Sequence, residues 1–315
     1  MKFCPGQIDK IVDFITNGRL PYHDTILIGD NAIGKSEAVR QIVKKLLGQN
    51  SVYFIDAVNR YFRVGGINES FETLEFSSHI TDVRLNDENF NLIDTWSYYG
   101  TKTESIEMIY TLFEDKIQKM MREYFGVTFS VAFKESQEVR YGTGEIGKLS
   151  SGYQAILRLF LELLYFNETT KKLAGEKTVV IDEIDEYLSP KTAGMLFPFL
   201  KKEFSDLNFV VTTHSADYIT AAVNCNIIIM QQDNYEILDS NDFNTLDDVS
   251  LIFKEVFGYS HKKTKSKEME EVLRYLLNNK IAGIWEKEDE QRLAAIREEA
   301  LSKAQKIIYR QIKEW

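Results

Sequence analysis

The sequence predicts an α/β fold in which a mostly parallel sheet is flanked by helices. Three short apolar runs support this prediction, at 25–28 (TILI), 178–181 (TVVI) and 209–213 (FVVTT). Each run is continuously apolar instead of alternating with polar residues, which is typical of strands in a parallel sheet covered on both faces. Each run is followed at once by glycine-rich or polar residues, so the predicted strands lead directly into the segments where chemistry is expected.

The composition is that of an ordinary globular protein. The chain has 315 residues, of which 44% are hydrophobic and 27% charged, enough for a substantial core in one large domain or two smaller ones. No apolar run approaches the roughly 18 residues of a membrane span, and the N-terminus lacks the apolar core of a signal peptide. Cys4 and Cys225 lie far apart, in no metal-ligand spacing. We therefore expect a cytoplasmic protein with reduced thiols and no membrane contact.

The charge of the chain is acidic and unevenly distributed. The net charge is −10 and the isoelectric point is near 5.1. This disfavours a broad nucleic-acid surface, because duplex affinity comes largely from clustered Lys and Arg. Residues 261–315 hold 13 Lys and Arg against 10 Asp and Glu, so this tail is mildly basic and the rest of the chain strongly acidic. Such a distribution fits a protein partner better than bare DNA.

The elements of the first half can be placed in chain order. A helix is predicted at 36–47, with one apolar side and with Gly48 as its stop, followed by a strand at 52–55. The pattern between 60 and 100 is mixed and predicts no definite element. An amphipathic helix is predicted at 104–125. Its apolar face is formed by Ile106, Ile109, Tyr110, Phe113, Ile117, Met120 and Met121.

The second half predicts a hairpin, a long helix and further strands. Residues 127–133 alternate like a half-buried strand that pairs with one near Val139. A strongly apolar helix is predicted at 155–166. Strands at 227–230 and 235–238 are the last in the sheet.

The predicted domain organisation is a large body with a helical tail. We expect the body at 1–260, including a helix and hairpin insertion at 104–147. The tail at 261–315 is predicted to be helical because its apolar residues recur at threes and fours. These residues are Leu273, Leu276, Leu277, Ile281, Ile284, Trp285, Leu293, Ile296, Leu301, Ile307, Ile308 and Ile312.

The first strand runs into the sequence GDNAIGKS, of the form G-x-x-x-x-G-K-S that binds nucleotide phosphates. Gly29 and Gly34 allow the loop to wrap the phosphates, and Asn31 lies within it. Lys35 is expected to reach the β- and γ-phosphates, and the hydroxyl of Ser36 to ligate Mg²⁺. The alternative, a glycine-rich turn without a nucleotide, is disfavoured by the flanking strand and helix.

Two acids and a histidine follow the other two strands. Asp182 is expected to hold Mg²⁺, usually through water, and Glu183 to accept the proton of the attacking water. His214 is expected to contact the γ-phosphate and orient that water. The alternatives are two solvated acids at a strand end and a packed histidine. The phosphate loop favours the catalytic interpretation.

The sequence LSSGYQ, just before the apolar helix predicted at 155–166, is expected to form a helix start. Ser150 and Gly152 at the start of this helix can donate hydrogen bonds to a phosphate. The alternative is an ordinary helix start capped by Ser150 or Ser151.

Together the segments GDNAIGKS, LSSGYQ, VVIDEIDEYLSP and TTHS resemble the head domain of ABC-type ATPases. More narrowly, they resemble the branch of RecF-like, SMC-like and overcoming-lysogenisation-defect-like ATPases, over most of 25–230. The resemblance implies a phosphate-loop NTPase that hydrolyses ATP with Mg²⁺. It also implies that Ser150 and Gly152 face the nucleotide of a second subunit, so that a homodimer or higher homo-oligomer completes each site.

The residues after the two acids separate this chain from transporters. Transporter subunits usually continue with Pro-Thr, whereas residues 184–190 (IDEYLSP) resemble the ATPases of prokaryotic antiphage defence modules. The insertion is too short for the coiled-coil arms of SMC proteins. The segments after His214 show no nuclease core. We therefore expect the effector, a nuclease or toxin, to be a separately encoded protein.

The chain departs from the family pattern at several positions. Ala32 stands where a Gly is usual, Tyr153 where the signature usually has Gln, and Ser189 where an Asp commonly links the two sites. No Gln lies between Gln49 and Gln118, so the Gln that normally senses Mg²⁺ and the γ-phosphate has no assignment.

The N-terminal strands that usually contact adenine are expected to be shortened. Phe3, Phe14 and Tyr22 are candidates for base stacking, although a core position is the favoured interpretation of each.

The leading hypothesis is an ATPase sensor or regulatory subunit of a bacterial defence or toxin module. A DNA-repair ATPase of the RecF or SMC kind is the alternative, for which the run Lys262, Lys263, Lys265 and Lys267 is the candidate basic patch. A nucleotide-binding subunit of an ABC transporter is a third, disfavoured interpretation.

Overall fold

The structure is a computed structural model. It describes residues 5–47, 51–67, 74–96, 105–132, 138–141, 146–147, 149–232, 234–243, 245, 249–250, 269, 272–273, 275–277, 279–280, 285–297 and 301–314. The predictions for Phe3, Cys4, Gly48 and the lysine run after His261 lie outside these residues. The chain divides into two compact units, Met1–Phe257 and Gly258–Trp315. The predicted boundary at 260 also falls outside the described residues.

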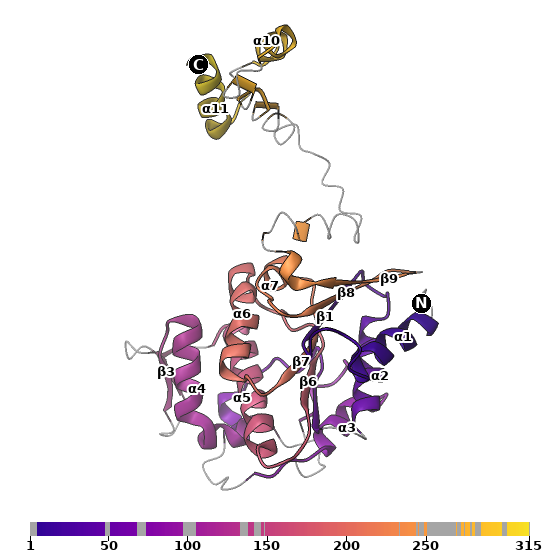
Figure 1. The fold of residues 1–315 in the computed structure, drawn as a ribbon. Helices are drawn as coiled ribbons and strands as arrows, with labels where there is room; N and C mark the ends of the chain where they lie inside the picture. Colours follow the sequence, from indigo (N-terminus) through magenta and orange to yellow (C-terminus); the bar gives the residue numbers. More distant parts are fainter. Residues whose placement is uncertain are drawn as a thin grey trace. The chain divides into compact units, whose positions relative to one another are not determined.

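The larger unit contains one central sheet and the helices that cover it (Figure 1). Its sheet strands are β1 (Thr25–Gly29), β2 (Ser51–Ile55), β6 (Lys177–Ile181), β7 (Asn208–Thr212), β8 (Asn226–Met230) and β9 (Tyr235–Asp239). Its α-helices, among the described residues, are α1 (Pro5–Thr16), α2 (Lys35–Leu46), α3 (His79–Leu85), α4 (Tyr110–Phe125), α5 (Ser151–Thr170), α6 (Pro190–Glu203) and α7 (Ala216–Thr220).

The strand order of the central sheet is β2-β6-β7-β1-β8-β9. All neighbouring strands pair in parallel except β8 and β9, which are antiparallel. The predicted α/β fold with a mostly parallel sheet is therefore confirmed. Because β1, β6 and β7 are parallel neighbours, their carboxyl ends meet at one edge of the sheet, which is where ligands bind in such folds.

Each strand contributes side chains to both faces of the sheet, since successive residues point to opposite sides. Helices α1 and α2 cover one face, and α4, α5, α6 and α7 contribute to the cluster on the other. On the first face lie Leu27, Phe54, Val180, Val210 and Ile228. On the second lie Ile26, Tyr53, Val179, Val211 and Ile227. Burial on both faces explains why the strands are continuously apolar.

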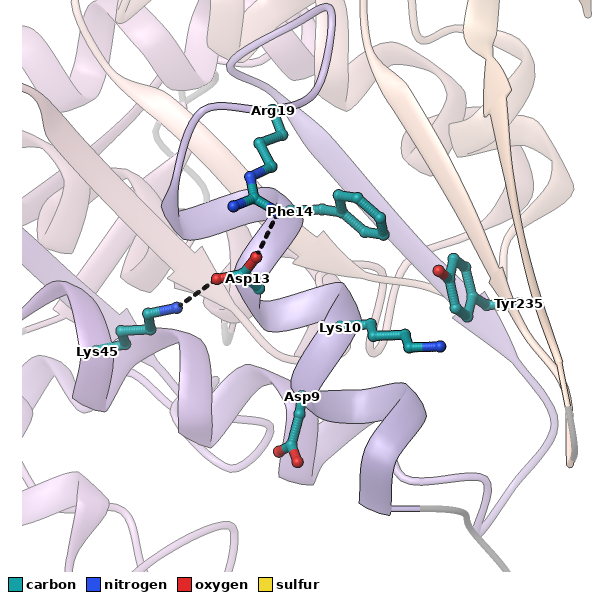
Figure 2. A pocket seen from close by; sticks show the side chains of 7 residues that line it. All are labelled: Asp9, Lys10, Asp13, Phe14, Arg19, Lys45 and Tyr235. Carbon is teal, nitrogen blue, oxygen red and sulfur yellow. Dashed lines mark hydrogen bonds and ion pairs between the residues drawn. The ribbon is translucent and has the colours of Figure 1, made fainter.

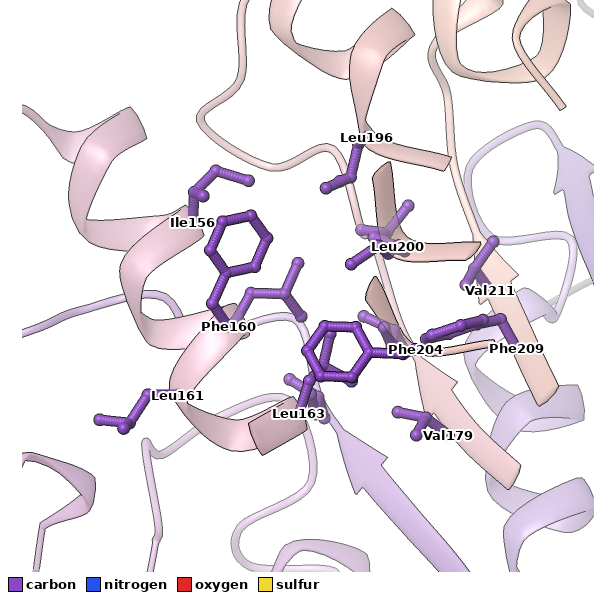
Figure 3. Packing of buried hydrophobic residues seen from close by; sticks show 14 of the residues in the cluster. Ile156, Phe160, Leu161, Leu163, Val179, Leu196, Leu200, Phe204, Phe209 and Val211 are labelled. Carbon is purple, nitrogen blue, oxygen red and sulfur yellow. The ribbon is translucent and has the colours of Figure 1, made fainter. Parts of the chain in front are cut away.

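Helix α5 is apolar on nearly its whole circumference because it lies between the sheet and other helices. Ile156, Phe160 and Leu163 point toward α6 and strands β6 and β7 (Figure 3). Phe160 is fully buried and its ring stacks on Phe199 of α6, with centroids 5.1 Å apart. Burial of one such side chain contributes about 1.5–3 kcal/mol, so this packing holds α5 firmly against the sheet.

The insertion before α5 has the helix and hairpin that the sequence predicts. The predicted helix at 104–125 begins, within the described residues, as a 3₁₀ turn, Ile106–Ile109, and continues as α4. Its predicted apolar residues are all buried. A small antiparallel sheet follows, with strands β3 (Phe129–Ala132), β4 (Glu138–Tyr141) and β5 (Ile146–Gly147) in that order. Val131 pairs with Val139, as expected.

The described N-terminal segment is a helix, α1, and no strand precedes β1 among the described residues. In α1 the residues Ile8, Ile11 and Val12 are buried and Asp9, Lys10 are exposed. This spacing is that of an amphipathic helix. It places α1 on α2, and the buried residues of both helices belong to the apolar cluster on this face of the sheet.

The smaller unit is helical in its described part and has its own apolar cluster. Its α-helices include α10 (Lys287–Ala294) and α11 (Lys303–Glu314). The buried cluster is formed by Leu273, Leu276, Ile296, Leu301, Tyr309 and Ile312. Among the described residues of the chain, no helix is both long and apolar enough to cross a bilayer.

Candidate functional site

The phosphate loop follows β1 at the carboxyl edge of the sheet. A Cβ on Gly29 would lie 2.6 Å from the carbonyl oxygen of Met230, so the close approach of β8 requires glycine there. Gly34 has φ 101° and ends the loop in the left-handed conformation, directly before α2. The free N–H groups and positive dipole end of α2 therefore face the loop, which is the arrangement that binds phosphate.

Lys35 is buried inside this loop, with 7% of its surface exposed. Its Nζ donates to the carbonyl oxygens of Gly29, at 2.9 Å, and Asp30, at 3.0 Å. Burial lowers the pKa of the Lys35 ammonium, while the nearby carboxylates of Asp182 and Glu183 act in the opposite direction. The Lys35 ammonium therefore lies at the loop and interacts electrostatically with Asp182 and Glu183.

Asp182 is buried, and each of its carboxylate oxygens is oriented by another side chain. The Thr212 hydroxyl donates to Oδ1 at 2.5 Å, and Asn91 Nδ2 donates to Oδ2 at 2.7 Å. The backbone N–H of Asp182 donates to Ile55 at the end of β2, at 2.9 Å. The carboxylate is therefore fixed at the end of β6, with further lone pairs for other ligands.

Glu183 occupies a left-handed backbone conformation, with φ 51°. Its N–H donates to the Thr212 hydroxyl at 2.7 Å. The buried Arg60 holds the same peptide from the other side, since Nη2 donates to the carbonyl oxygens of Asp182, at 2.8 Å, and Glu183, at 3.1 Å. Burial, followed by the charges of Asp182 and Glu186, raises the pKa of Glu183. This favours proton acceptance.

His214 lies just beyond β7, the strand between β1 and β6. Burial, followed by the charge of Lys35, lowers the pKa of its imidazole, while Asp30 and Asp182 oppose this shift. Because β7 pairs in parallel with both β1 and β6, His214 follows the carboxyl end of β7 at the same sheet edge as the phosphate loop and the acid pair. A neutral imidazole at this position can donate or accept a hydrogen bond near a phosphate.

The segment LSSGYQ forms the N-terminus of α5. Ser150 is exposed and caps the helix, its side chain accepting from the Tyr153 N–H at 3.4 Å. A Cβ on Gly152 would lie 3.1 Å from the carbonyl oxygen of Tyr187. The capping interpretation of Ser150 is therefore confirmed, and its role toward the phosphate of a second subunit remains a prediction. Ser189, in the place of the family's Asp, caps α6.

A buried group of charged residues lies behind the acid pair. Glu162 of α5 accepts from Arg84 of α3 at 2.7 Å and from Arg158 of α5 at 2.6 Å. Burial opposes ionisation of Glu162, but the two guanidinium groups outweigh it and lower its pKa to about 2. Sequence reasoning missed this group and Asn91. The available signal was two charged residues inside an otherwise apolar helix, since buried charges are rarely tolerated without partners.

The aromatic candidates for base stacking have other contacts in the structure. The Tyr22 hydroxyl donates to Asp239 at 2.8 Å. Phe14 faces Tyr235 with ring centroids 6.1 Å apart. Both rings line a pocket of about 550 Å³ on α1, together with Asp9, Lys10, Asp13, Arg19 and Lys45 (Figure 2). This lining contains none of the predicted phosphate-loop or acid residues, so the structure gives no support for base stacking by Phe14 or Tyr22.

The residues present fit a Mg²⁺ ion shared with a nucleotide. Mg²⁺ in nucleotide sites usually takes one or two protein oxygens, phosphate oxygens and water. Ser36 lies in the first turn of α2, and the oriented carboxylate of Asp182 lies at the end of β6. Among the described residues, no group of three or more His, Cys, Asp or Glu could hold a metal ion.

The chain is similar in sequence to one curated ATPase. It is 37% identical over 73 residues to the Retron Ec83 probable ATPase of Escherichia coli. The match covers 22% of this chain and 14% of that relative, so the chain matches about one seventh of the relative's length. No family model matches the chain.

Comparison with solved structures returns SMC heads. The SMC head domain from Thermotoga maritima is 21% identical, with a TM-score of 0.31 over 42% of this chain and 50% of that chain. A chain from a structure on ATP-driven dimerization and DNA-stimulated activation of SMC ATPases is 14% identical, with a TM-score of 0.34. The match covers 48% of this chain and 97% of that chain. At these scores the fold assignment depends on the sheet order and the motifs themselves. The four motifs and the match to the retron ATPase bear out the resemblance to ATPases of the ABC type.

Proposed function

We propose that this chain is a cytoplasmic ATP-binding and ATP-hydrolysing regulatory subunit that dimerises around ATP and controls a separate effector. The observation that supports this most strongly is the convergence of four groups at one sheet edge. These are the loop with Lys35, the fixed carboxylate of Asp182, the oriented Glu183 and the imidazole of His214. ATP hydrolysis needs a phosphate cradle, a metal ligand and a proton acceptor together, and this edge supplies all three.

In the proposed reaction Glu183 accepts a proton from water as the water oxygen bonds to the γ-phosphorus and the bond to the β–γ bridging oxygen breaks. The raised pKa of Glu183 improves its match to this task. Lys35 leaves the carbonyls of Gly29 and Asp30 for the β- and γ-phosphate oxygens, and His214 orients the water. Bound Mg²⁺ would neutralise phosphate charge, with the Ser36 hydroxyl and Asp182 as its protein ligands.

The proposed site is shared between two copies of the chain. Ser150 is exposed at the N-terminus of α5, a place where N–H groups can bind a phosphate presented from outside. Glu183 and Lys35 lie at the end of the sheet, where they can contact the nucleotide from one side. A second copy then supplies Ser150 and Gly152 to the other face, so that ATP joins the two subunits.

We place this ATPase in a bacterial antiphage defence or toxin module. The support is the sequence after Glu183 and the similarity to a retron ATPase. The effector is proposed to be a separate nuclease or toxin protein.

Co-purification with the products of neighbouring genes tests the regulatory role. The wild-type chain and Glu183→Gln are each tagged and purified from cells that express the neighbours. We expect both chains to retain the product of one neighbouring gene. The amount of this product bound per chain should differ between ATP-loaded and ADP-loaded samples. An assembly that hydrolyses ATP and retains no neighbouring product would contradict the regulatory role and leave the ATPase assignment intact.

A further inference from the structure

Asn91 is the one side chain of the described loop 86–96 that contacts the acid pair directly. Its Nδ2 donates to Oδ2 of Asp182 at 2.7 Å, and its Oδ1 accepts from the Ala57 N–H at 2.9 Å. The carboxamide therefore bridges the carboxylate of Asp182 and the segment after β2. Both ends of the amide are used, so its orientation is determined by hydrogen bonds.

The backbone of Asn91 is adapted to this contact. Its φ is 53°, a left-handed conformation that Asn tolerates better than most residues. The neighbours Leu92 and Ile93 are exposed, at 70% and 45%. The loop is held by packing, since Phe90 stacks on Phe54 with ring centroids 5.7 Å apart, and by the polar contacts of Asn91.

The same loop is attached to helix α5 by buried ion pairs. Arg84, just before the loop, binds Glu162 of α5 through two nitrogens, and its Nε donates to the Thr95 carbonyl at 3.3 Å. Asp94, near the end of the loop, pairs with Arg158 of α5 at 2.9 Å. The loop is thus attached to α5 at both ends and to Asp182 in its middle.

We propose that Asn91 is a positioning residue for Asp182, and that the loop 86–96 links helix α5 to the acid pair. The proposal deepens the proposed ATPase function and rests on it. Asn91 is neutral, so it can fix one oxygen of Asp182 without adding a charge that competes for the metal. Thr212 fixes the other oxygen. A movement of α5, whose N-terminus bears Ser150, is passed to Asp182 through Arg158, Asp94 and Asn91.

The chemistry explains why an amide serves here. The amide supplies a donor to the carboxylate and an acceptor to the Ala57 N–H from two separate atoms, whereas an ionised acid has no donor and a hydroxyl has both functions on one atom. A hydrogen bond to a charged group contributes about 1.5–3 kcal/mol. Loss of the bond therefore corresponds to roughly a ten- to hundredfold change in any equilibrium that depends on the position of Asp182.

Asn91→Gly removes the amide and keeps the backbone conformation, since glycine adopts positive φ without strain. Glu88→Ala is the matched control, because Glu88 is exposed on the same loop. The readout is the ratio of ATP affinities measured with Mg²⁺ and with excess chelator. We expect Asn91→Gly to keep the metal-free affinity, to reduce the gain from Mg²⁺ by about tenfold, and to lower kcat. Glu88→Ala is expected to match the wild type.

Two results separate the possible failures. A wild-type chain that neither binds nor hydrolyses ATP would refute the proposed function. A wild-type chain that does both, with an unchanged Mg²⁺ gain in a folded Asn91→Gly variant, would refute the role of Asn91 alone. Thermal melting without nucleotide establishes that the variant is folded.

A double-mutant cycle tests the link to α5. Asp94→Ala removes the pair with Arg158, and the buried Arg158 keeps its ion pair with Glu162, so the change leaves no unpaired buried charge. We expect Asp94→Ala to lower kcat, and the double variant with Asn91→Gly to be no slower than Asn91→Gly alone, because both changes act through the same contact. Effects on kcat that multiply independently would refute the link.

Discussion

The hydroxyl of Thr212 donates a hydrogen bond of 2.5 Å to Oδ1 of Asp182. The hydroxyl oxygen of Thr212 in turn accepts from the N–H of Glu183 at 2.7 Å. The last residue of β7 therefore fixes the carboxylate proposed for the metal and the backbone of the proposed base. Strand β7 lies between the strands of the phosphate loop and the acid pair, so one hydroxyl transmits the geometry of the sheet to both acids.

Thr212→Val is expected to lower both stability and turnover. The change keeps the shape of the side chain but leaves the Asp182 carboxylate and the Glu183 N–H without this partner, at a cost of about 1–3 kcal/mol. Denaturant unfolding and steady-state ATPase assays measure the two effects. Thr212→Ser should restore most of both. Thr220→Val is the control, because the Thr220 hydroxyl bonds within α7 to the Ala216 carbonyl. Equal effects of the two valine variants on turnover would contradict this role.

Lys35→Met is expected to separate nucleotide binding from folding. The buried ammonium donates to carbonyl oxygens of the loop, and burial already disfavours its charge. Its replacement by an uncharged chain should leave the melting temperature without nucleotide within a few degrees, which for a chain of this size corresponds to about 1 kcal/mol. The rise in melting temperature on addition of ATP should disappear.

The exposed Lys44, on the same helix, provides the matched control. Lys44→Met should keep the ATP-dependent rise. A Lys35→Met variant that is stabilised by ATP as strongly as the wild type would refute the phosphate-binding role of the loop.

Glu162→Gln is expected to destabilise the fold severely. The change leaves the buried guanidinium groups of Arg84 and Arg158 without their shared carboxylate, and an uncompensated buried charge costs about 3–5 kcal/mol. Glu168→Gln is the control, since Glu168 forms ion pairs with Lys116 and Lys171 near the surface and such pairs contribute about 0–1 kcal/mol. Urea unfolding of both variants at neutral pH measures the difference. Similar free energies of unfolding for the two variants would contradict the predicted contribution of the buried ion pairs of Glu162 to stability.

Asp56 gives the fold a pH dependence that can be measured. Burial raises the pKa of Asp56 to about 6, although Arg84 and Arg60 oppose this shift. The folded pKa lies above the unfolded value of 3.8, so the folded state holds this proton more tightly. The contribution of Asp56 to stability is therefore full below pH 4, is lost as the pH rises to about 6, and amounts to about 3 kcal/mol.

Asp56→Asn should remove this contribution, because the amide does not ionise. The free energy of unfolding of the variant minus that of the wild type should become more positive between pH 4 and pH 6.5 and stay constant above it. Denaturant titrations at a series of pH values measure this difference. Parallel stability curves over that range would contradict the raised pKa.

The sequence predicted the elements where a local pattern determines the structure. Helix α2 begins one residue before its predicted start. The prediction was close because the phosphate loop leads directly into a helix and because this helix has a clear apolar side. Strands β1, β6 and β7 were recognisable since burial on both faces makes them continuously apolar. The site residues on these strand ends were predictable for the same reason, because each lies within a few residues of a recognisable strand.

The contacts that orient the site could not be predicted from local patterns. Arg84 and Glu162 are 78 residues apart in the chain, and Asn91 lies in a stretch whose mixed composition predicts no element. Its partner Asp182 is 91 residues away. Such pairs depend on how α3 and α5 pack on the sheet, which one sequence does not determine. The sequence analysis predicted no element at 5–16, although the amphipathic spacing of Ile8, Ile11 and Val12 was the available signal for α1.

The central claim is that ATP joins two copies of this chain at sites that each copy completes for the other. The most direct test is the solution mass of Glu183→Gln, which should bind ATP but retain it unhydrolysed, because the amide accepts no proton from water. Glu186→Gln is the control, since Glu186 is the neighbouring acid on the same turn. Its turnover should stay close to that of the wild type.

The mass of Glu183→Gln should double on addition of ATP and Mg²⁺ and stay unchanged with ADP. Adding Ser150→Arg, which blocks the exposed N-terminus of α5, should abolish the doubling while ATP binding persists. A mass of Glu183→Gln that is the same with and without ATP, or a doubling that survives Ser150→Arg, would contradict the account.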